Sequence, residues 1–164
     1  MDRKKVASLI NRRIIAVMIA GFASGLPLAL SDSTLQAWLT VLDMDIRTIG
    51  LFSLVGLPYV LKLFWAPIID RFGFSFLSRR RDWMCITQIL AAILLFSLAI
   101  STTDNTTLMF VALLSFFLAF ISATQDIAVD AYRADLLSSD ERGFGAATSV
   151  TAYRIAMLFS GAGA

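Results

Sequence analysis

Two carboxylates and an arginine share one face of an apolar segment in the second half of the chain. Asp126, Asp130 and Arg133 are spaced i, i+4 and i+7 within the stretch FISATQDIAVDAYRADLL, so a helix would place them along one side. Two ionised carboxylates on adjacent turns repel each other, and one of them can then hold a proton near neutral pH. A nearby cation would return that carboxyl to its charged form. The pattern therefore predicts a proton-binding site at Asp126 and Asp130 that responds to movable cations.

Lys62 and Arg154 are predicted to lie at a membrane depth similar to that of Asp126. At about 1.5 Å per helical residue, Lys62 and Asp126 lie ~12 and ~13 Å from the inner ends of their segments, and Arg154 lies ~16 Å from its own. Charges at such depth usually face a bundle interior, and pairing between helices would lower their insertion cost. We expect the two cations to tune the proton site or to bind carboxylates of a substrate. The alternative is that each side chain snorkels toward the interface.

The polar groups at the end of the same segment allow a simpler interpretation. Asp130, Arg133 and Asp135 can form the hydrated cytoplasmic end of a long helix, with Asp130 and Arg133 as an i,i+3 ion pair. Asp126 lies deeper, and a functional role is favoured there because intramembrane charges are costly.

The first apolar segment carries its own polar cluster, LSDSTLQAW. Asp32 and Gln36 in this cluster favour a water-filled cavity that holds a hydrophilic ligand. Upstream, Gly21, Gly25 and Pro27 allow a helix break or a close approach between helices. We predict that Gly21 and Gly25 form a packing groove.

Five apolar segments must position these residues. Their approximate limits are 14–38, 49–69, 83–100, 108–128 and 144–164. Hydrophobic residues make up 58% of the chain and charged residues 16%, against about 45–50% and roughly 25% in soluble domains. A bilayer span needs about 20 apolar helical residues, which each segment approaches. The predicted fold is an all-α, polytopic transmembrane bundle of about five helices.

The connecting loops predict the orientation of this bundle. Bases cluster in the first 13 residues and in the second connection, whereas the first and third connections hold one base and none. Basic loops stay in the cytoplasm, so we place the N-terminus inside. The chain divides into a cytoplasmic N-terminal segment, 1–13, and a transmembrane bundle, 14–164, that is still helical at its last residue. That ending predicts the N-terminal part of a longer protein.

Composition also limits the partners. The net charge of +2 comes from bases that lie between apolar runs, which does not favour nucleic acid. The chain has no His, and a single Cys85 cannot form an internal disulfide. We predict neither a metal nor a cofactor, and an intramembrane proton carrier must then be Asp, Glu, Tyr or Cys.

Several stretches resemble known transporters. The loop IIDRFGFSFLSRRRDW is similar to the loop between helices two and three of major facilitator transporters, although its run of bases comes late. The residues that carry this likeness are Asp70, Arg71, Gly73, Arg79, Arg80 and Arg81. The stretches GFASGLPLAL, LPYVLKLFWAPIIDR, SATQDIAVDAYRADLL and ERGFGAA together resemble the AmpG-type muropeptide permeases over nearly the whole chain. The acetyl-CoA transporters of endomembranes share parts of this pattern.

The resemblance implies a major facilitator fold, of which this chain would supply most of the N-terminal half. It implies an importer in the bacterial inner membrane that moves anhydro-muropeptides for cell-wall recycling and is driven by the proton gradient. Membrane lipid, the proton, the muropeptide and the missing C-terminal half are then the expected partners. Helices one and four line the central cavity of such folds, which assigns Asp32, Gln36, Gln125 and Asp126 to that cavity. The loop after helix two would lock the two halves through charge contacts, a gating role.

The sequence therefore favours a proton-coupled importer in which Asp126, coupled to Asp130, carries the proton. The expected substrate-binding residues are Asp32, Gln36, Lys62, Gln125 and Arg154. A related acetyl-CoA-type transporter is one alternative. An integral-membrane enzyme acting on lipid-linked wall precursors is another, and it would use Asp126 and Asp130 as paired acids. A non-transporting fragment is the third.

Overall fold

All the secondary structure in the described residues is helical. The computed structural model describes residues 12–29, 35–41, 43–71, 79–101 and 108–162. The helices are, in chain order, α2 (Arg12–Ala29), α3 (Leu35–Val41), α4 (Ile46–Phe52), α5 (Leu57–Leu61), α6 (Ala66–Arg71), α7 (Arg79–Ser101), α8 (Leu108–Leu136) and α9 (Arg142–Ala162). Two short 3-10 turns, η2 (Ser53–Gly56) and η3 (Lys62–Phe64), join α4, α5 and α6. The predicted all-α transmembrane bundle is confirmed.

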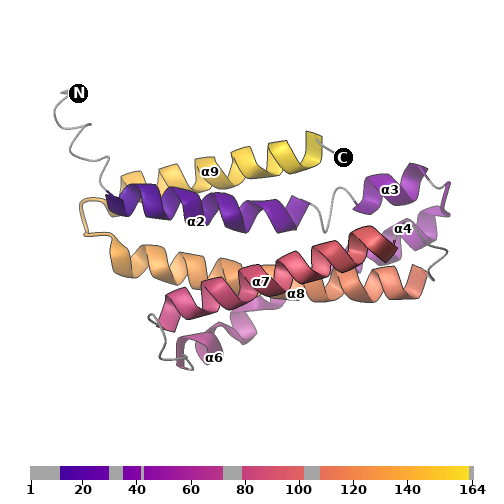
Figure 1. The fold of residues 1–164 in the computed structure, drawn as a ribbon, viewed down its shortest axis with the longest axis horizontal. Helices are drawn as coiled ribbons and strands as arrows, with labels where there is room; N and C mark the ends of the chain where they lie inside the picture. Colours follow the sequence, from indigo (N-terminus) through magenta and orange to yellow (C-terminus); the bar gives the residue numbers. More distant parts are fainter. Residues whose placement is uncertain (1–11, 30–34, 42, 72–78, 102–107, 163–164) are drawn as a thin grey trace.

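The long helices form a bundle in which α8 is central. In Figure 1, α2 lies along α9 on one side and α7 lies along α8 on the other. α8 also contacts α2 and the broken segment from η2 to α6. As a result, α8 buries small and apolar side chains such as Ser115, Leu118 and Ala119 among its neighbours. Its polar residues are thereby held against three other helical segments.

Two glycines of α2 allow it to approach α9 closely. A Cβ atom added at Gly21 would lie 2.7 Å from the carbonyl oxygen of Ser149, and one at Gly25 would lie 2.6 Å from that of Tyr153. Real Cβ atoms essentially never come this close, so a larger residue would push the two helices apart. Small residues bring helix backbones together in this way in membranes. The predicted packing groove at Gly21 and Gly25 is confirmed.

The structure describes two helices within the first apolar segment. α2 ends at Ala29 with Pro27 inside it, and α3 begins at Leu35. A proline removes one backbone donor and clashes with the preceding turn, so a helix tends to end or kink near it. Residues 30–34 between the two helices lie outside the described residues, so the continuity of the segment over 14–38 stays a prediction. Asp32 lies outside the described residues.

The second apolar segment is interrupted. Gly56 and Pro58 stand where η2 gives way to α5, and η3 begins at Lys62. Glycine weakens a helix and proline cannot donate to the previous turn, which favours tighter 3-10 turns at this point. In Figure 1 the segment runs from α4 at the right of the picture to α6 at the lower left. Because of these breaks, the side chain of Lys62 points in a different direction from the one it would have in an unbroken α-helix.

The described residues contain three helical stretches long and apolar enough to cross a membrane. They are Ile46–Phe64, Arg80–Ser101 and Leu108–Leu136. α9 is not among them because Arg154, Tyr153 and several Ser and Thr residues lower its hydropathy. α8 continues well past the predicted end at 128, because its polar end finds partners and Leu137 packs against Ile14.

One end of the bundle gathers the predicted cytoplasmic ends of the helices. Arg13 at the start of α2 lies 3.9 Å from Glu141, just before α9. Glu141 accepts hydrogen bonds from the backbone N–H and the hydroxyl of Ser138, which lower the pKa of the Glu141 carboxyl below its ordinary value. Both hydrogen bonds lie in the turn that joins α8 to α9. The N-terminus-inside orientation and the division at residue 13 stay predictions.

Candidate functional site

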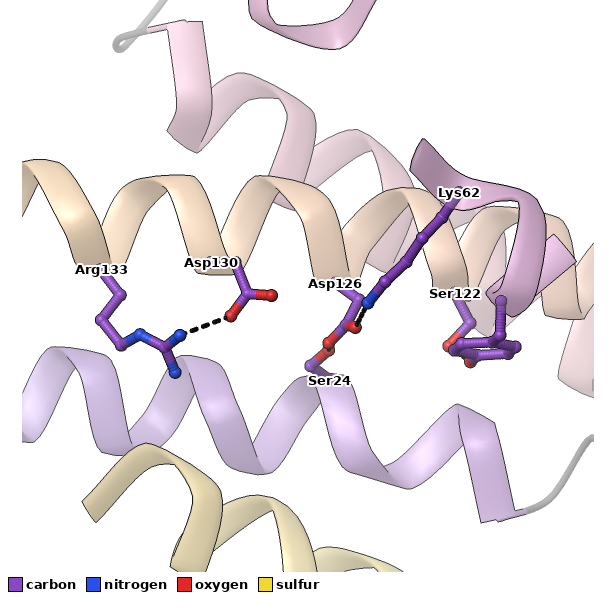
Figure 2. Close-up of polar contacts among 7 residues, drawn as sticks. Ser24, Lys62, Ser122, Asp126, Asp130 and Arg133 are labelled. Carbon is purple, nitrogen blue, oxygen red and sulfur yellow. Dashed lines mark hydrogen bonds and ion pairs between the residues drawn. The ribbon is translucent and has the colours of Figure 1, made fainter. Parts of the chain in front are cut away.

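The centre of the site is the carboxylate of Asp126 on α8. Lys62 from η3 forms an ion pair with Asp126 Oδ2, and the Ser24 hydroxyl of α2 donates a hydrogen bond to Oδ1 at 3.0 Å. Figure 2 shows these two side chains meeting Asp126 from opposite sides. The side chains of Lys62 and Asp126 are 29% and 19% exposed, so the pair is partly shielded. Three helical segments therefore meet at one carboxylate.

Further hydrogen bonds hold the broken second segment against α8. The Tyr59 hydroxyl donates to the Ser122 hydroxyl one turn from Asp126. The indole N–H of Trp65 donates to the Thr124 hydroxyl at 3.3 Å. Hydrogen bonds between helices give these polar groups a partner inside the membrane, and each bond stabilises one position of a helix relative to the other. Tyr59 and Trp65 thus position Lys62, which lies between them, opposite Asp126.

Asp130 and Arg133 form an ion pair along α8. The Arg133 guanidinium lies 2.9 Å from Asp130 Oδ1, with both side chains on the face of α8 that is turned toward α2 (Figure 2). This is the i,i+3 pair that the sequence offered as the simpler interpretation. Asp130 lies one turn from Asp126, as predicted, and each of the two carboxylates has its own cation.

A cavity of about 450 Å³ opens beside Asp126 between α2, α8 and α9. Its charged and phenolic lining residues are Asp126, Arg133, Tyr153 and Arg154. Gly21 also lines the cavity, at the close approach of α2 to α9. Arg154 therefore shares a cavity with Asp126, as its predicted depth required. The side chain of Lys62 reaches the same carboxylate from the other side of α8.

Gln125 does not share that cavity. Its side chain is 2% exposed and its amide donates to Gln88 of α7. It lines a second, mostly apolar cavity of about 590 Å³ between α2, α7 and α8, together with Cys85. Gln125 and Asp126 line different cavities because neighbouring residues on a helix point about 100° apart. Their assignment to the central cavity of a major facilitator fold stays a prediction. Gln36 lies half-buried on α3 and lines neither cavity.

The predicted gating residues contribute to an ion network at the inner end of the bundle. Arg80 of α7 bridges Asp70 at the end of α6, at 3.1 Å, and Asp135 at the end of α8. Asp135 was interpreted as a merely hydrated residue, so its role in this network was missed. Its position at the end of a segment with a basic loop nearby was the available signal. Arg71 and Arg81 are exposed, whereas Gly73 and the side chain of Arg79 lie outside the described residues.

The described part of the chain has no group of three or more potential metal ligands. In the site, Lys62 is paired with Asp126 and Arg133 with Asp130. An ion pair and a polar cavity inside long apolar helices form a site that can bind charged solutes within a membrane. Such an arrangement is typical of membrane transporters.

The comparison with known families agrees with this class of protein. The family model described as acetyl-coenzyme A transporter 1 matches residues 14–161. The chain belongs to this family of membrane transporters. The predicted resemblance to permeases of the AmpG type is confirmed by the relatives.

Three relatives illustrate this. The anhydromuropeptide permease of Escherichia coli K12 is 49% identical over 91% of this chain and 30% of its own length. An uncharacterized protein of Haemophilus influenzae is 43% identical over 98% of this chain and 38% of its own length. The putative transporter AmpG 4 of Rickettsia conorii is 39% identical over 93% of this chain and 37% of its own length. The chain thus spans between 30% and 38% of the length of these relatives. Together with the apolar helices, they identify a multi-pass inner-membrane protein.

Proposed function

We propose that this chain is part of a proton-coupled transporter that imports anhydro-muropeptides across the bacterial inner membrane for cell-wall recycling. The observation that carries the proposal is the contact of Lys62, Ser24 and Asp126 within the apolar bundle. The similarity to an anhydromuropeptide permease supports the choice of solute. The names of the relatives favour transport over an enzymatic reaction.

The proton step follows from the chemistry of a carboxylate with a removable cation. While Lys62 contacts Asp126, the ionised carboxylate is favoured. If a conformational change separates Lys62 from Asp126, the isolated carboxylate in apolar surroundings favours its protonated form. Asp130, one turn away, adds a second negative charge that favours this protonation. Lys62 lies in η3, and a 3-10 turn inside a long helix is a common place for a hinge.

The other predicted residues take their roles from position. We assign Arg154 and Lys62 to anionic groups of the solute, since Arg154 lines the cavity beside Asp126 and Lys62 pairs with Asp126. Gln125 is buried and lines the second cavity. Asp32 and Gln36 stay predicted substrate-binding residues. The bridge of Asp70 and Asp135 by Arg80 is a candidate inner gate, since it joins three helix ends.

An acetyl-CoA-type transporter is the second candidate. It is favoured by one specific observation, the description of the matching family as acetyl-coenzyme A transporter 1. Both candidates would carry a bulky solute with negative charges. They differ in whether those charges belong to carboxylates or to phosphates.

Uptake of radiolabelled anhydro-muropeptide tests the proposal. Cells without their own permease would express the full-length parent of this chain, with or without a protonophore. We expect uptake by the parent to collapse with the protonophore. In the Asp126→Asn variant, solute should equilibrate across the membrane without accumulating, because the neutral side chain cannot exchange a proton. Asp140→Asn, an exposed carboxylate between α8 and α9, is the matched control and should accumulate solute normally.

Two results would contradict the proposal. A stably inserted parent that does not take up anhydro-muropeptide would refute the choice of solute. Accumulation against a gradient by Asp126→Asn would refute the assignment of the proton to Asp126. Uptake of acetyl-CoA in place of the muropeptide would support the second candidate.

A further inference from the structure

We propose that the cavity between α2, α8 and α9 is an anion subsite that binds a carboxylate of the transported solute through Arg154. The inference rests on the proposed function, since it names the chemical group that this transporter recognises. It also assigns supporting roles to Tyr153 and Arg133, which the sequence did not predict as binding residues.

The balance of charges around the cavity is the first argument. Lys62 is paired with Asp126, and Arg133 is paired with Asp130. Among the residues that the structure describes, no carboxylate forms an ion pair with Arg154. The five charges together leave one positive charge, and it is on Arg154. An arginine deep in a transmembrane bundle is costly unless an anion approaches it, so its default interpretation is a functional site.

The shape of the cavity is the second argument. Its volume of about 450 Å³ falls in the usual range of small-molecule sites, about 300–1,000 Å³. A disaccharide with an attached peptide would not fit within it entirely, whereas one charged branch of such a solute would. Gly21 and Val129 are among the residues that line it, and the charged groups converge from α8 and α9. The cavity is therefore a subsite for one end of the solute.

The chemistry of the lining residues is the third argument. A guanidinium presents parallel N–H donors that match the two oxygens of a carboxylate. Tyr153 lies next to Arg154 in the chain and lines the same cavity. Its hydroxyl can donate a further hydrogen bond to a bound anion. Arg133 adds a second guanidinium on the cytoplasmic side of the cavity.

A carboxylate is favoured over a phosphate by the charge of the site. The net charge around the cavity is a single positive charge, which matches the single negative charge of a carboxylate. A pyrophosphate group would bring more negative charge next to Asp126 and Asp130, which are already anionic. Competition between acetyl-CoA and the free-acid muropeptide distinguishes a phosphate from a carboxylate as the bound group.

Equilibrium binding to the purified full-length parent tests the inference without requiring transport. The two probes are an anhydro-muropeptide with free carboxylates in its peptide and the same compound with those carboxylates converted to amides. We expect Arg154→Gln to raise the Kd of the free acid by about 10- to 100-fold, the scale of hydrogen bonds to charged groups, and to change the Kd of the amide by less than about 3-fold. Arg154→Lys keeps the positive charge but not the planar guanidinium. Its Kd for the free acid should lie between the values for the parent and for Arg154→Gln.

The matched control is Arg142→Gln, which removes an exposed arginine at the start of the same helix and should leave both Kd values unchanged. Circular dichroism and gel filtration would check that each variant is folded. If Arg154→Gln raised the Kd values of the free acid and of the amide equally, the inference would be overturned. Stronger competition by acetyl-CoA than by the free acid would overturn the choice of a carboxylate.

A second probe separates failure of the inference from failure of the proposed function. The dipeptide Ala-Glu and its diamide carry the same contrast without the sugar. In one outcome, the parent fails to bind the muropeptide and still binds Ala-Glu more tightly than the diamide. If Arg154→Gln then abolishes that preference, the result supports the subsite and contradicts the proposed solute. If the parent binds the muropeptide and Arg154→Gln keeps the preference for the free acid, the result supports the proposed function and contradicts the subsite.

Discussion

Lys62 and Asp126 form an ion pair between η3 and α8, and its energetics follow from its surroundings. Removing one partner of a shielded ion pair leaves an uncompensated charge, which costs more than removing both. The side chains are 29% and 19% exposed, so some screening by solvent lowers that cost. The pair is therefore strong enough to hold η3 against α8 and weak enough to open.

A double-mutant cycle measures this pair. We expect Lys62→Met and Asp126→Asn each to lower the free energy of unfolding by about 1–3 kcal/mol, since each leaves one polar group without its partner. The double variant should lose less than the sum, with a coupling energy of roughly 0.5–3 kcal/mol. The measurement is unfolding of the purified full-length protein by denaturing detergent in mixed micelles.

Asp140→Asn serves as the control, alone and combined with Lys62→Met. Asp140 is exposed between α8 and α9, so its combination with Lys62→Met should be additive. Additive losses for Lys62→Met with Asp126→Asn would mean that the two side chains do not interact in the membrane.

At the scale of the element, α8 carries two separate polar faces. Asp126, Asp130 and Arg133 face α2 and the cavity beside α9, whereas Gln125 faces Gln88 on α7. A helix can separate two such functions by one residue because consecutive side chains differ in direction by about 100°. α2 contacts both sides of this arrangement through Ser24 and its alanines. The position of α2 therefore sets the shape of both cavities.

The close packing of α2 on α9 should be sensitive to a single methyl group. We expect Gly25→Ala to destabilise the protein by about 1–3 kcal/mol, because the added Cβ atom would lie 2.6 Å from the Tyr153 carbonyl oxygen. The added Cβ atom should also push α9 away from α2. This movement should weaken binding at the Arg154 cavity, since Tyr153 of α9 lines it. Thermal unfolding and the Kd of the free acid would measure the two effects.

Gly143→Ala is the matched control at the other end of α9. No atom lies within 4 Å of a Cβ added there, so this change should be neutral or stabilise the helix slightly. A Gly25→Ala protein as stable as the parent would show that α2 and α9 are not packed as closely in the membrane.

At the scale of the whole molecule, the helix ends are joined by a network of exposed ion pairs. Arg80 is 30% exposed, and its partners Asp70 and Asp135 are 56% and 61% exposed. Pairs of this kind contribute only about 0.2–1 kcal/mol each. A gate that opens and closes in each transport cycle requires such modest contacts, because a strong lock would trap one state.

Removing this bridge should loosen the inner end of the bundle without unfolding it. We expect Arg80→Gln to raise hydrogen-exchange rates of the amides in α6 and in the last turn of α8 by about 2- to 10-fold, the kinetic equivalent of one or two exposed pairs. Exchange in the first turn of α9, which contains none of the bridge residues, should stay unchanged. Mass spectrometry of exchanged peptides provides the measurement.

Arg142→Gln removes an equally basic side chain near the same end and should leave the exchange of α6 and α8 unaltered. Equal exchange in the parent and Arg80→Gln would rule out a gating role for the bridge. Faster exchange throughout the bundle would indicate a general structural role for Arg80 in place of a gate.

The sequence by itself determined the membrane class, the approximate helices and the depth of the charged residues. These properties are local, since hydrophobic length fixes a span and the helical rise fixes depth along it. For this reason Lys62, Asp126 and Arg154 could be placed at similar depth, and Gly21 and Gly25 could be recognised as packing residues. The likeness to a transporter family followed from the same local stretches.

Only the tertiary structure decided which side chains meet. The pairing of Lys62 with Asp126, the bridge from Arg80 to Asp135 and the turn of Gln125 toward Gln88 depend on the rotation of each helix and on its neighbours. Small local breaks change that rotation, as η3 does at Lys62. A one-residue difference moves a side chain about 100° around its helix, so depth is set by the sequence, whereas contact is set by packing.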